Sequence, residues 1–253
     1  MAENEIYQYS IISALMDGVG SSGLPISDLV AHGDHGLGTF RNMAGEMIVL
    51  DGRVFQMKSD GTVTAVDSSP GALDPADGLP VVAPFAMLTR FRPTASRAAC
   101  RPRSKAELAG LVSDLLPPGS RNLYAAFRLR GTMASVTVRT ADGQRFPGEP
   151  LRALGGRQVT HVFEREEGGT LFGFRSPAFS HGVSVAGDHM HFISADRRRG
   201  GHVLALDVGA EGAGVEVEVA PISRVHMELP VGDEQFDAAE LALDSAGIKA
   251  VEG

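Results

Sequence analysis

Cysteine is almost absent from the sequence, which contains only Cys100. A single cysteine cannot form an intrachain disulfide, and it cannot supply the several thiolates of a structural zinc site. Any metal site would therefore depend on histidine and carboxylate ligands. Long apolar runs are absent too, since none reaches the roughly 18 residues of a membrane-spanning helix, and the acidic residues 1–5 do not resemble a secretory signal. We therefore expect a cytoplasmic protein with no membrane contact.

Positive charge is also scarce. The 23 lysines and arginines face 31 acidic residues, which gives a formal net charge of −8. Nucleic-acid-binding proteins usually gather Lys and Arg to neutralise phosphates. The one basic run, at residues 97–105, is short and has no interleaved aromatic residues, so we interpret it as a solvated loop. These features argue against a nucleic-acid partner.

The order of predicted elements indicates a chain rich in β-strands with few helices. Alternating apolar residues predict strands at 6–9, 46–50, 54–57 and 62–66, and residues 67–84 carry prolines typical of a surface loop. Ser104 and Glu107 form a capping box for one longer helix. Beyond residue 123 nearly all predicted elements are strands, separated by breaks at Gly131 and at the Glu/Gly segment before Thr170. Strands at this spacing predict a small barrel or a sandwich.

Three of the eight histidines lie between positions 189 and 202. His189 and His191 are two residues apart, so in a strand their side chains share one face. The turn residues at 195–201 predict a hairpin that returns His202 beside them. Three neutral imidazoles with an open position are typical of a catalytic divalent metal site, most often zinc. The alternative is a set of ordinary histidines on a half-exposed strand, but the same-face spacing favours metal binding.

Three other features have two interpretations each. Glu46 begins an apolar strand, so it is either a solvated strand end or an acid that reaches into the core. Arg139 shares a strand face with Ser135 and Thr137, and it points either into a polar cavity or to the surface. The glycine-rich residues 33–40 resemble a dinucleotide fingerprint but neither follow a predicted strand nor open a helix. We interpret this run as a tight loop that leads into a strand.

Several longer motifs resemble those of the acetolactate decarboxylases of the microbial acetoin pathway. They lie at residues 6–10, 13–15, 32–34, 36–40, 45–52, 173–177, 189–193 and 200–203 and so extend over nearly the whole chain. The resemblance implies an α/β (α+β) fold with an N-terminal domain at 1–140, built on a mixed β-sheet with flanking helices. It further implies a β-barrel-like domain at 141–230 that carries the metal, a tail at 231–253 that folds back over the active site, and a homodimer.

The resemblance also implies an activity, the decarboxylation of (S)-2-acetolactate to (R)-acetoin and carbon dioxide. In this family zinc acts as the electron sink for the enediolate, and a glutamate donates the proton. The implied roles fall on His189, His191 and His202 as zinc ligands, Arg139 as the arginine that holds the substrate, Thr39 as a pocket residue, and Glu46 and Glu252 as catalytic acids. The chain departs from the family pattern in its Pro-rich loop at 67–84 and in its arginine-rich hairpin turn.

Two rival interpretations remain open at this point. A cupin-like metal oxygenase or isomerase also gathers three histidines, but it normally places a glutamate soon after the first pair and an asparagine after the last histidine. Here those regions offer Asp196 and Val203-Leu204, which fit poorly. A metal-storage domain would close the site with a fourth ligand, for which Glu46, Glu252 or Asp188 is available.

Overall fold

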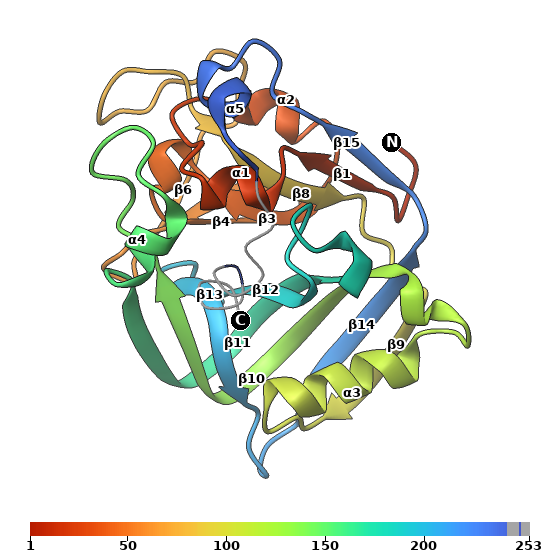
Figure 1. Cartoon of the computed structure of the whole chain (residues 1–253). Coiled ribbons are helices and arrows are strands. Elements are labelled where there is room, and N and C mark those ends of the chain that lie inside the picture. The colour runs from red at the N-terminus through yellow and green to blue at the C-terminus, as the bar shows by residue number, and fades with distance from the viewer. Residues whose placement is uncertain (242–247, 249–253) are drawn as a thin grey trace.

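The computed structural model describes residues 1–241 and 248, without the side chains of residues 165–167, and two β-sheets dominate it (Figure 1). One is a seven-stranded sheet with the order β15 (Val225–Glu228), β1 (Ile6–Tyr9), β8 (Phe85–Thr89), β3 (His35–Thr39), β4 (Glu46–Leu50), β5 (Arg53–Met57) and β6 (Val63–Ala65). Strands β15 and β1 pair in parallel, whereas the other neighbours are antiparallel. The predicted mixed sheet of the N-terminal half is therefore confirmed.

The second sheet has six strands and is partly closed. Its order is β11 (Val159–Ser176), β12 (Gly187–Ile193), β13 (Gly200–Asp207), β10 (Tyr124–Thr140), β14 (Val215–Ile222) and β9 (Ala95–Cys100). Because β11 pairs with β10 as well as with β12, the four strands β10 to β13 close into a small barrel. This confirms the barrel-like C-terminal half. A two-stranded pair, β2 (Leu24–Pro25) and β7 (Val82–Ala83), lies apart from both sheets.

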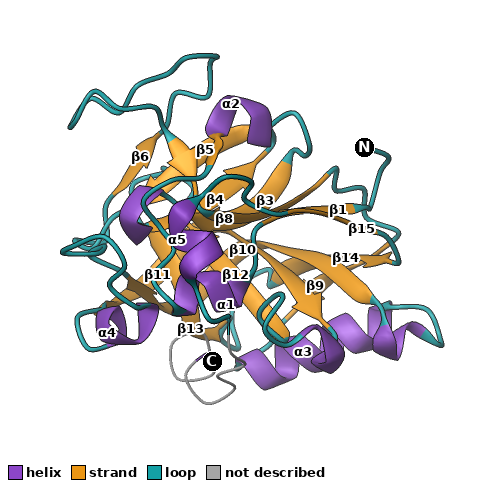
Figure 2. Ribbon diagram, turned by 45° about the horizontal axis from the view of Figure 1, so that its top comes forward, coloured by secondary structure: helices purple, strands orange, loops and turns teal. Residues whose placement is uncertain are grey.

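The helices are short (Figure 2), and the first of them is wholly buried, with Ile12, Leu15 and Met16 in the core between the sheets. They are α1 (Ile12–Met16), α2 (Ile26–Leu29), α3 (Lys105–Leu115), α4 (Leu151–Gly155) and α5 (Glu234–Ala238), with 3-10 turns at Arg41–Met43, Ser120–Asn122 and Ala178–Ser180. The predicted cap of α3 is present, because the Glu107 backbone N–H donates to Ser104 Oγ over 3.2 Å. No helix within residues 1–241 is long and apolar enough to cross a membrane.

The apolar core between the two sheets decides which side chains face the interior. Along β4, Ile48 belongs to this central core, whereas Met47 and Val49 pack in a separate cluster on the outer face of the seven-stranded sheet. Glu46 shares the face of Ile48 by alternation. Along β12, Ile193 lies in the central core, whereas Met190 and Phe192 pack beneath α3. His189 and His191 therefore project toward the seven-stranded sheet.

Two sequence predictions of loops are wrong, and pairing explains both. Residues 97–105, predicted as a solvated loop, begin within β9, which pairs with β14. The glycine-rich run at 33–40 contains strand β3. Its glycines are needed because a Cβ at Gly36 or Gly38 would lie 2.4 Å from a carbonyl oxygen of β8. Close approach of two strands therefore explains a pattern that resembled a loop.

The division of the chain between the sheets can be compared with the predicted domains. Strands β9 and β10 precede residue 140 but belong to the six-stranded sheet, and β15 returns to the seven-stranded sheet. The chain thus passes from one sheet to the other between Thr89 and Ala95, and back between Ile222 and Val225. Domain boundaries at 140 and 230 stay a prediction.

Candidate metal centre

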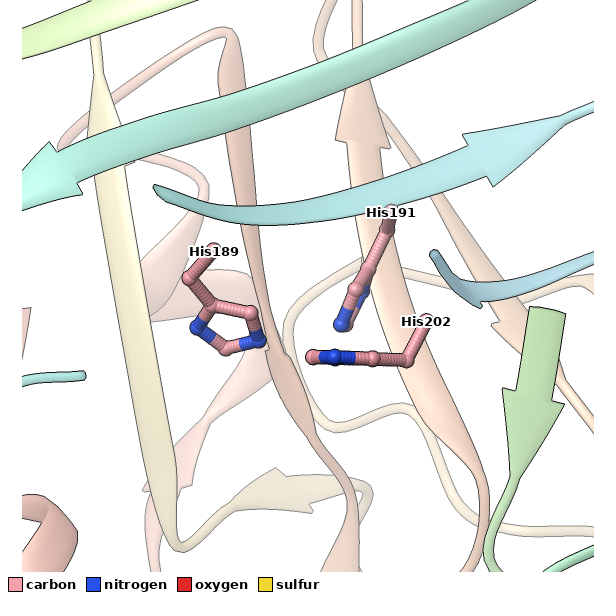
Figure 3. Close-up of side chains that lie close together, drawn as sticks. All are labelled: His189, His191 and His202. Carbon is pink, nitrogen blue, oxygen red and sulfur yellow. The ribbon is translucent and has the colours of Figure 1, made fainter. Parts of the chain in front are cut away.

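Three imidazole rings converge on the barrel face that is turned toward the seven-stranded sheet (Figure 3). His189 and His191 lie on β12, and His202 on β13 is the direct pairing partner of His191. The ring centroids are 4.9 to 5.5 Å apart. One nitrogen from each ring lies within 4.8 Å of the other two. The hairpin predicted from the sequence therefore brings the three candidate ligands together.

The three rings are buried, and burial sets their charge. It lowers the pKa of His191 to about 4, an effect that the hydrogen bond to Met47 partly opposes. Burial lowers the pKa of His189 and His202 as well, and the nearby charge of Arg139 adds to the effect in both. All three imidazoles are therefore neutral at pH 7, which is the form that binds a metal ion.

A backbone carbonyl fixes the orientation of His191. Its Nδ1 donates a hydrogen bond to the Met47 carbonyl oxygen of β4 over 2.6 Å. In the neutral ring Nε2 must then carry the lone pair. Nε2 is buried, has no hydrogen-bond partner among the described residues, and lies 3.6 Å from Glu46 Oε2. A second nitrogen held by a carbonyl is the usual support of a metal-binding histidine, so the group fits a divalent ion.

Glu46 and Arg139 both lie at the histidine cluster. The Glu46 carboxylate approaches His191 from the opposite sheet. Arg139 is buried, and its Nη2 lies 3.4 Å from His202 Nε2, because the two residues pair directly across β10 and β13. In the structure, Glu46 and Arg139 therefore both point inward, toward the histidines. The site contains a negative and a positive side chain beside three neutral rings.

A small cavity of about 30 Å³ adjoins the cluster and has mostly apolar walls. These walls consist of Ile12, Leu15, Met43, Phe85, Ala141 and Leu151. Thr39, Glu46, Gln158 and His189 supply its polar lining. Thr39 is directly opposite Glu46 across β3 and β4, and its hydroxyl donates to the Gly45 carbonyl over 2.8 Å. Thr39 therefore both lines the cavity and braces the turn that leads to Glu46.

Sequence reasoning missed two residues at the site. Lys105, at the start of α3, donates to the Val203 carbonyl over 3.4 Å, and its charge helps to lower the pKa of His189 and His202. Gln158 lines the cavity just before β11. Lys105 lies within the capping box of α3, which indicates a helix start and not a metal site, and Gln158 lies in no recognisable motif. The packing of α3 on the barrel brings Lys105 to the histidines, and strand pairing brings Gln158 there.

Asp188 and Glu252 are the other two candidates for a fourth metal ligand. Asp188 points away from the cluster and accepts two hydrogen bonds from Arg175, at 2.6 and 2.8 Å. It therefore does not close the site as a storage domain would require. Glu252 lies outside the described residues. Ile248, four residues before it, is buried in the central core between the sheets.

Fold and site together define an α+β protein with a candidate three-histidine metal centre that opens on a small cavity. The chain belongs to the alpha-acetolactate decarboxylase family, whose sequence model matches residues 6–243. It is therefore an enzyme of a decarboxylase family. This membership favours the decarboxylase interpretation over the cupin-like alternative.

Named relatives and a solved structure agree with the assignment. The alpha-acetolactate decarboxylase of Methylococcus capsulatus is 38% identical over 236 residues, which cover 93% of this chain and 84% of that protein. The alpha-acetolactate decarboxylase of Bacillus subtilis is 33% identical, over 79% of this chain and 73% of that protein. A crystal structure of the enzyme from B. subtilis strain 168 superposes with a TM-score of 0.86 at 29% identity, covering 98% of this chain and 99% of that one.

Proposed function

We propose that the protein decarboxylates (S)-2-acetolactate to (R)-acetoin and carbon dioxide, with Zn²⁺ held by His189, His191 and His202. One observation carries the proposal: three buried, neutral imidazoles converge beside Glu46 in a chain of this family. The carbonyl that fixes the His191 ring supports a role as a ligand. With only one cysteine in the chain, the ligands must come from histidine and carboxylate side chains, which agrees with a three-histidine set.

The substrate determines what the site has to supply. Acetolactate is a β-keto acid, so the departure of carbon dioxide leaves an electron pair that the adjacent ketone can accept. Bound Zn²⁺ would supply a positive charge, undiminished by its three neutral ligands, that stabilises this developing negative charge. The remaining tasks are to orient the carboxylate, to protonate one carbon on one face, and to keep water away. We assign these tasks to side chains of the chain.

Arg139 is the proposed carboxylate-binding residue. Its guanidinium is buried beside His202 and is fixed by the pairing of β10 with β13. A guanidinium can bind a carboxylate through two parallel N–H···O bonds, which sets the orientation of the group as well as its position. The bond to the departing carboxylate would then be held in one direction relative to the ketone, as efficient decarboxylation requires.

Glu46 is the proposed proton donor for the carbon that loses carbon dioxide. Its strand neighbours Thr39 and Met57 fix the backbone on both sides, so its carboxyl group approaches the histidines from the seven-stranded sheet alone. A donor on one side would make the product chiral. Glu252 is the alternative donor and stays a prediction, as does a substrate-binding role for Thr39. The apolar cavity walls would pack against the methyl groups of the substrate and limit access of water.

The proposed activity is tested by supplying acetolactate to the purified protein and measuring carbon dioxide and acetoin, without any organic cofactor. We expect turnover that a chelator abolishes and Zn²⁺ restores. Glu46→Gln should reduce kcat by about 10²- to 10⁴-fold, the usual contribution of a general acid. Glu216→Gln, at an exposed ion pair with Arg130, is the matched control and should leave kcat unchanged. An inert wild-type protein that carries zinc would contradict the proposal.

Metal binding is tested separately from activity. Elemental analysis should find about one zinc ion for each wild-type chain, and His202→Ala should lose most of it because one of three ligands is gone. His226→Ala, at the exposed surface, provides a matched control that retains zinc. Equal zinc contents in the two variants would refute the assigned ligand set.

We also propose a homodimer that forms through β15. This strand is an edge of the seven-stranded sheet, and it pairs only with β1 among the described residues. Val225 and Met227 alternate along it, Leu229 follows it directly, and all three are exposed, Met227 by 49%. An exposed apolar edge strand favours pairing with another chain. Light scattering should give the mass of a dimer, and Met227→Lys should shift the protein toward the monomer; a monomeric wild type would exclude the dimer. The cytoplasmic location stays a prediction.

A further inference from the structure

Gln158 is a polar residue of the cavity wall to which the proposed mechanism gives no role. Most of the wall is apolar, and its other polar residues already have functions: His189 binds the metal, Glu46 is the acid, and Thr39 braces the turn before Glu46. Gln158 is half-buried, and it is the one residue of this polar lining that has no assigned role. The position of Gln158 therefore needs an explanation.

The five glutamines of the chain differ in how their amides are used. Four of them hydrogen-bond to the backbone and hold loops in place: Gln8 with Ser10 and Val183, Gln56 with Ala44, Gln144 with Gly18 and Glu149, and Gln235 with Ser21. Among the described residues, the Gln158 side chain makes no hydrogen bond. Within the described part of the chain, no residue thus occupies its N–H and C=O groups.

The backbone around Gln158 is fixed on both sides. Arg157, the residue before it, donates to both carboxylate oxygens of Glu149 at 2.7 and 2.9 Å and to the Gly143 carbonyl at 3.2 Å. Val159, the residue after it, pairs with Thr140 of β10. A side chain carried by a rigid backbone loses little further freedom when it binds a ligand.

The strand pairing also relates Gln158 to the proposed substrate-binding arginine. Thr160 lies directly opposite Arg139 across β11 and β10, so their side chains share one face of the ladder. Gln158 lies two residues before Thr160, just outside β11, and lines the cavity together with His189 and Glu46. A hydrogen-bond donor thus lies at the cavity beside the histidine cluster that Arg139 adjoins.

We propose that Gln158 binds the substrate, with its amide N–H donating a hydrogen bond to an oxygen of the bound 2-hydroxy-3-oxo carboxylate. The inference rests on the proposed function and adds a residue to that site. A neutral donor recognises an oxygen without adding charge near Glu46 or the histidines. Because an analogue that lacks the oxygen would leave this donor without its partner in the complex, such a residue would also discriminate against that analogue.

The kinetic test uses two substitutions of similar size, Gln158→Leu and Gln158→Glu, in the zinc-loaded protein. Loss of one hydrogen bond to a charged or polarised oxygen should raise KM by about 10- to 100-fold. Zinc content should equal that of the wild type, since Gln158 is not a ligand. Gln235→Leu removes a glutamine that does not line the cavity and should retain the wild-type KM. A wild-type KM in Gln158→Leu would overturn the proposal.

The Gln158→Glu variant separates binding from a merely structural role. The introduced carboxylate offers no donor when ionised and repels the substrate carboxylate, whereas its protonated form can donate again. The defect of this variant relative to the wild type should therefore shrink as the pH falls toward the ordinary glutamate pKa of about 4.3. A defect that is constant with pH would indicate loss of structure and would contradict substrate binding.

A binding experiment distinguishes failure of this inference from failure of the proposed function. The probe is the reduced analogue, 2,3-dihydroxy-2-methylbutanoate, which has an alcohol in place of the ketone and cannot lose carbon dioxide. Calorimetry should give a Kd for the wild type that rises about 10-fold or more in Gln158→Leu. An active wild type with equal Kd values in both proteins would overturn the role of Gln158 alone. A wild type that neither binds the analogue nor turns over acetolactate would overturn both.

Discussion

Replacing Arg128 with methionine should break a buried ion pair within the six-stranded sheet and a hydrogen bond that connects this sheet to the other one. Arg128 lies on β10 and donates to both carboxylate oxygens of Glu218 on β14, at 2.8 and 3.2 Å. A third N–H reaches Nε2 of His35 on β3, in the other sheet, over 2.8 Å. Asp34 fixes that ring by accepting from His35 Nδ1 over 2.8 Å. One guanidinium thus connects both layers that enclose the metal centre.

The magnitude follows from burial. The Arg128 and Glu218 side chains are only 11% and 7% exposed, so Arg128→Met leaves a carboxylate nearly out of water, with only partial compensation from the half-exposed Arg130, whose Nη2 lies 3.4 Å from Glu218 Oε2. Removing one partner of a buried pair costs about 3–5 kcal/mol of unfolding free energy, and we expect about 3 kcal/mol here because the pair keeps slight solvent contact. The double variant Arg128→Met, Glu218→Leu should lose less than the sum of the two single losses, because no unpaired charge remains.

The assay is urea unfolding at fixed protein and zinc concentrations, since bound metal and subunit association both shift apparent stability. Arg103→Met provides the matched control. Arg103 also holds a carboxylate by two bonds, to Asp207 at 2.9 and 3.0 Å, but its side chain is 56% exposed. An exposed pair contributes about 0–1 kcal/mol. If Arg128→Met and Arg103→Met cost the same, burial does not govern the strength of these pairs and the reasoning fails.

Three further predictions concern single residues. Burial lowers the pKa of His35, with Asp34 opposing the shift, so the unfolded chain binds the proton more readily and stability falls as pH drops below about 6.5. His35→Asn should flatten this fall in urea midpoints between pH 7 and 5, and parallel curves would refute it. Gly173→Ala places a Cβ 2.5 Å from the His189 carbonyl oxygen and should weaken zinc binding in a metal titration, whereas Gly110→Ala, with open space around it, should not. Ser104→Ala removes the cap of α3 and should lower the free energy of unfolding by about 1 kcal/mol in thermal denaturation, and an unchanged midpoint would contradict this role of the cap.

The metal-site hairpin could be predicted because its signals are local. The spacing of His189 and His191 and the turn chemistry before His202 lie within one short stretch of chain, and strand alternation has a period of two in any sheet. The same alternation placed Glu46 and Arg139 on faces that could point inward, but it could not choose between inside and outside. That choice depends on which second surface covers the strand.

The closed barrel could not be predicted because its decisive pairing is non-local. The sequence predicts a break at Gly131 and another before Thr170, yet β10 and β11 each run through them as one strand. Gly131 and Gly169 lie directly opposite each other in the ladder, beside a bulge between Gly131 and Met133. Glycine predicts a turn when a strand is considered alone, and here the partner strand overrides that preference.

The same distinction explains why the site depends on both sheets. A hairpin alone would carry its three histidines on one face open to water, where their pKa values would stay near 6.5 and protons would compete with a metal near neutral pH. The seven-stranded sheet covers that face and adds two groups from one strand, the Met47 carbonyl that orients His191 and the Glu46 carboxylate. Burial then keeps the rings neutral well below pH 7. The ligands are therefore encoded locally, whereas their protonation and the acid beside them arise from the packing of two distant parts of the chain.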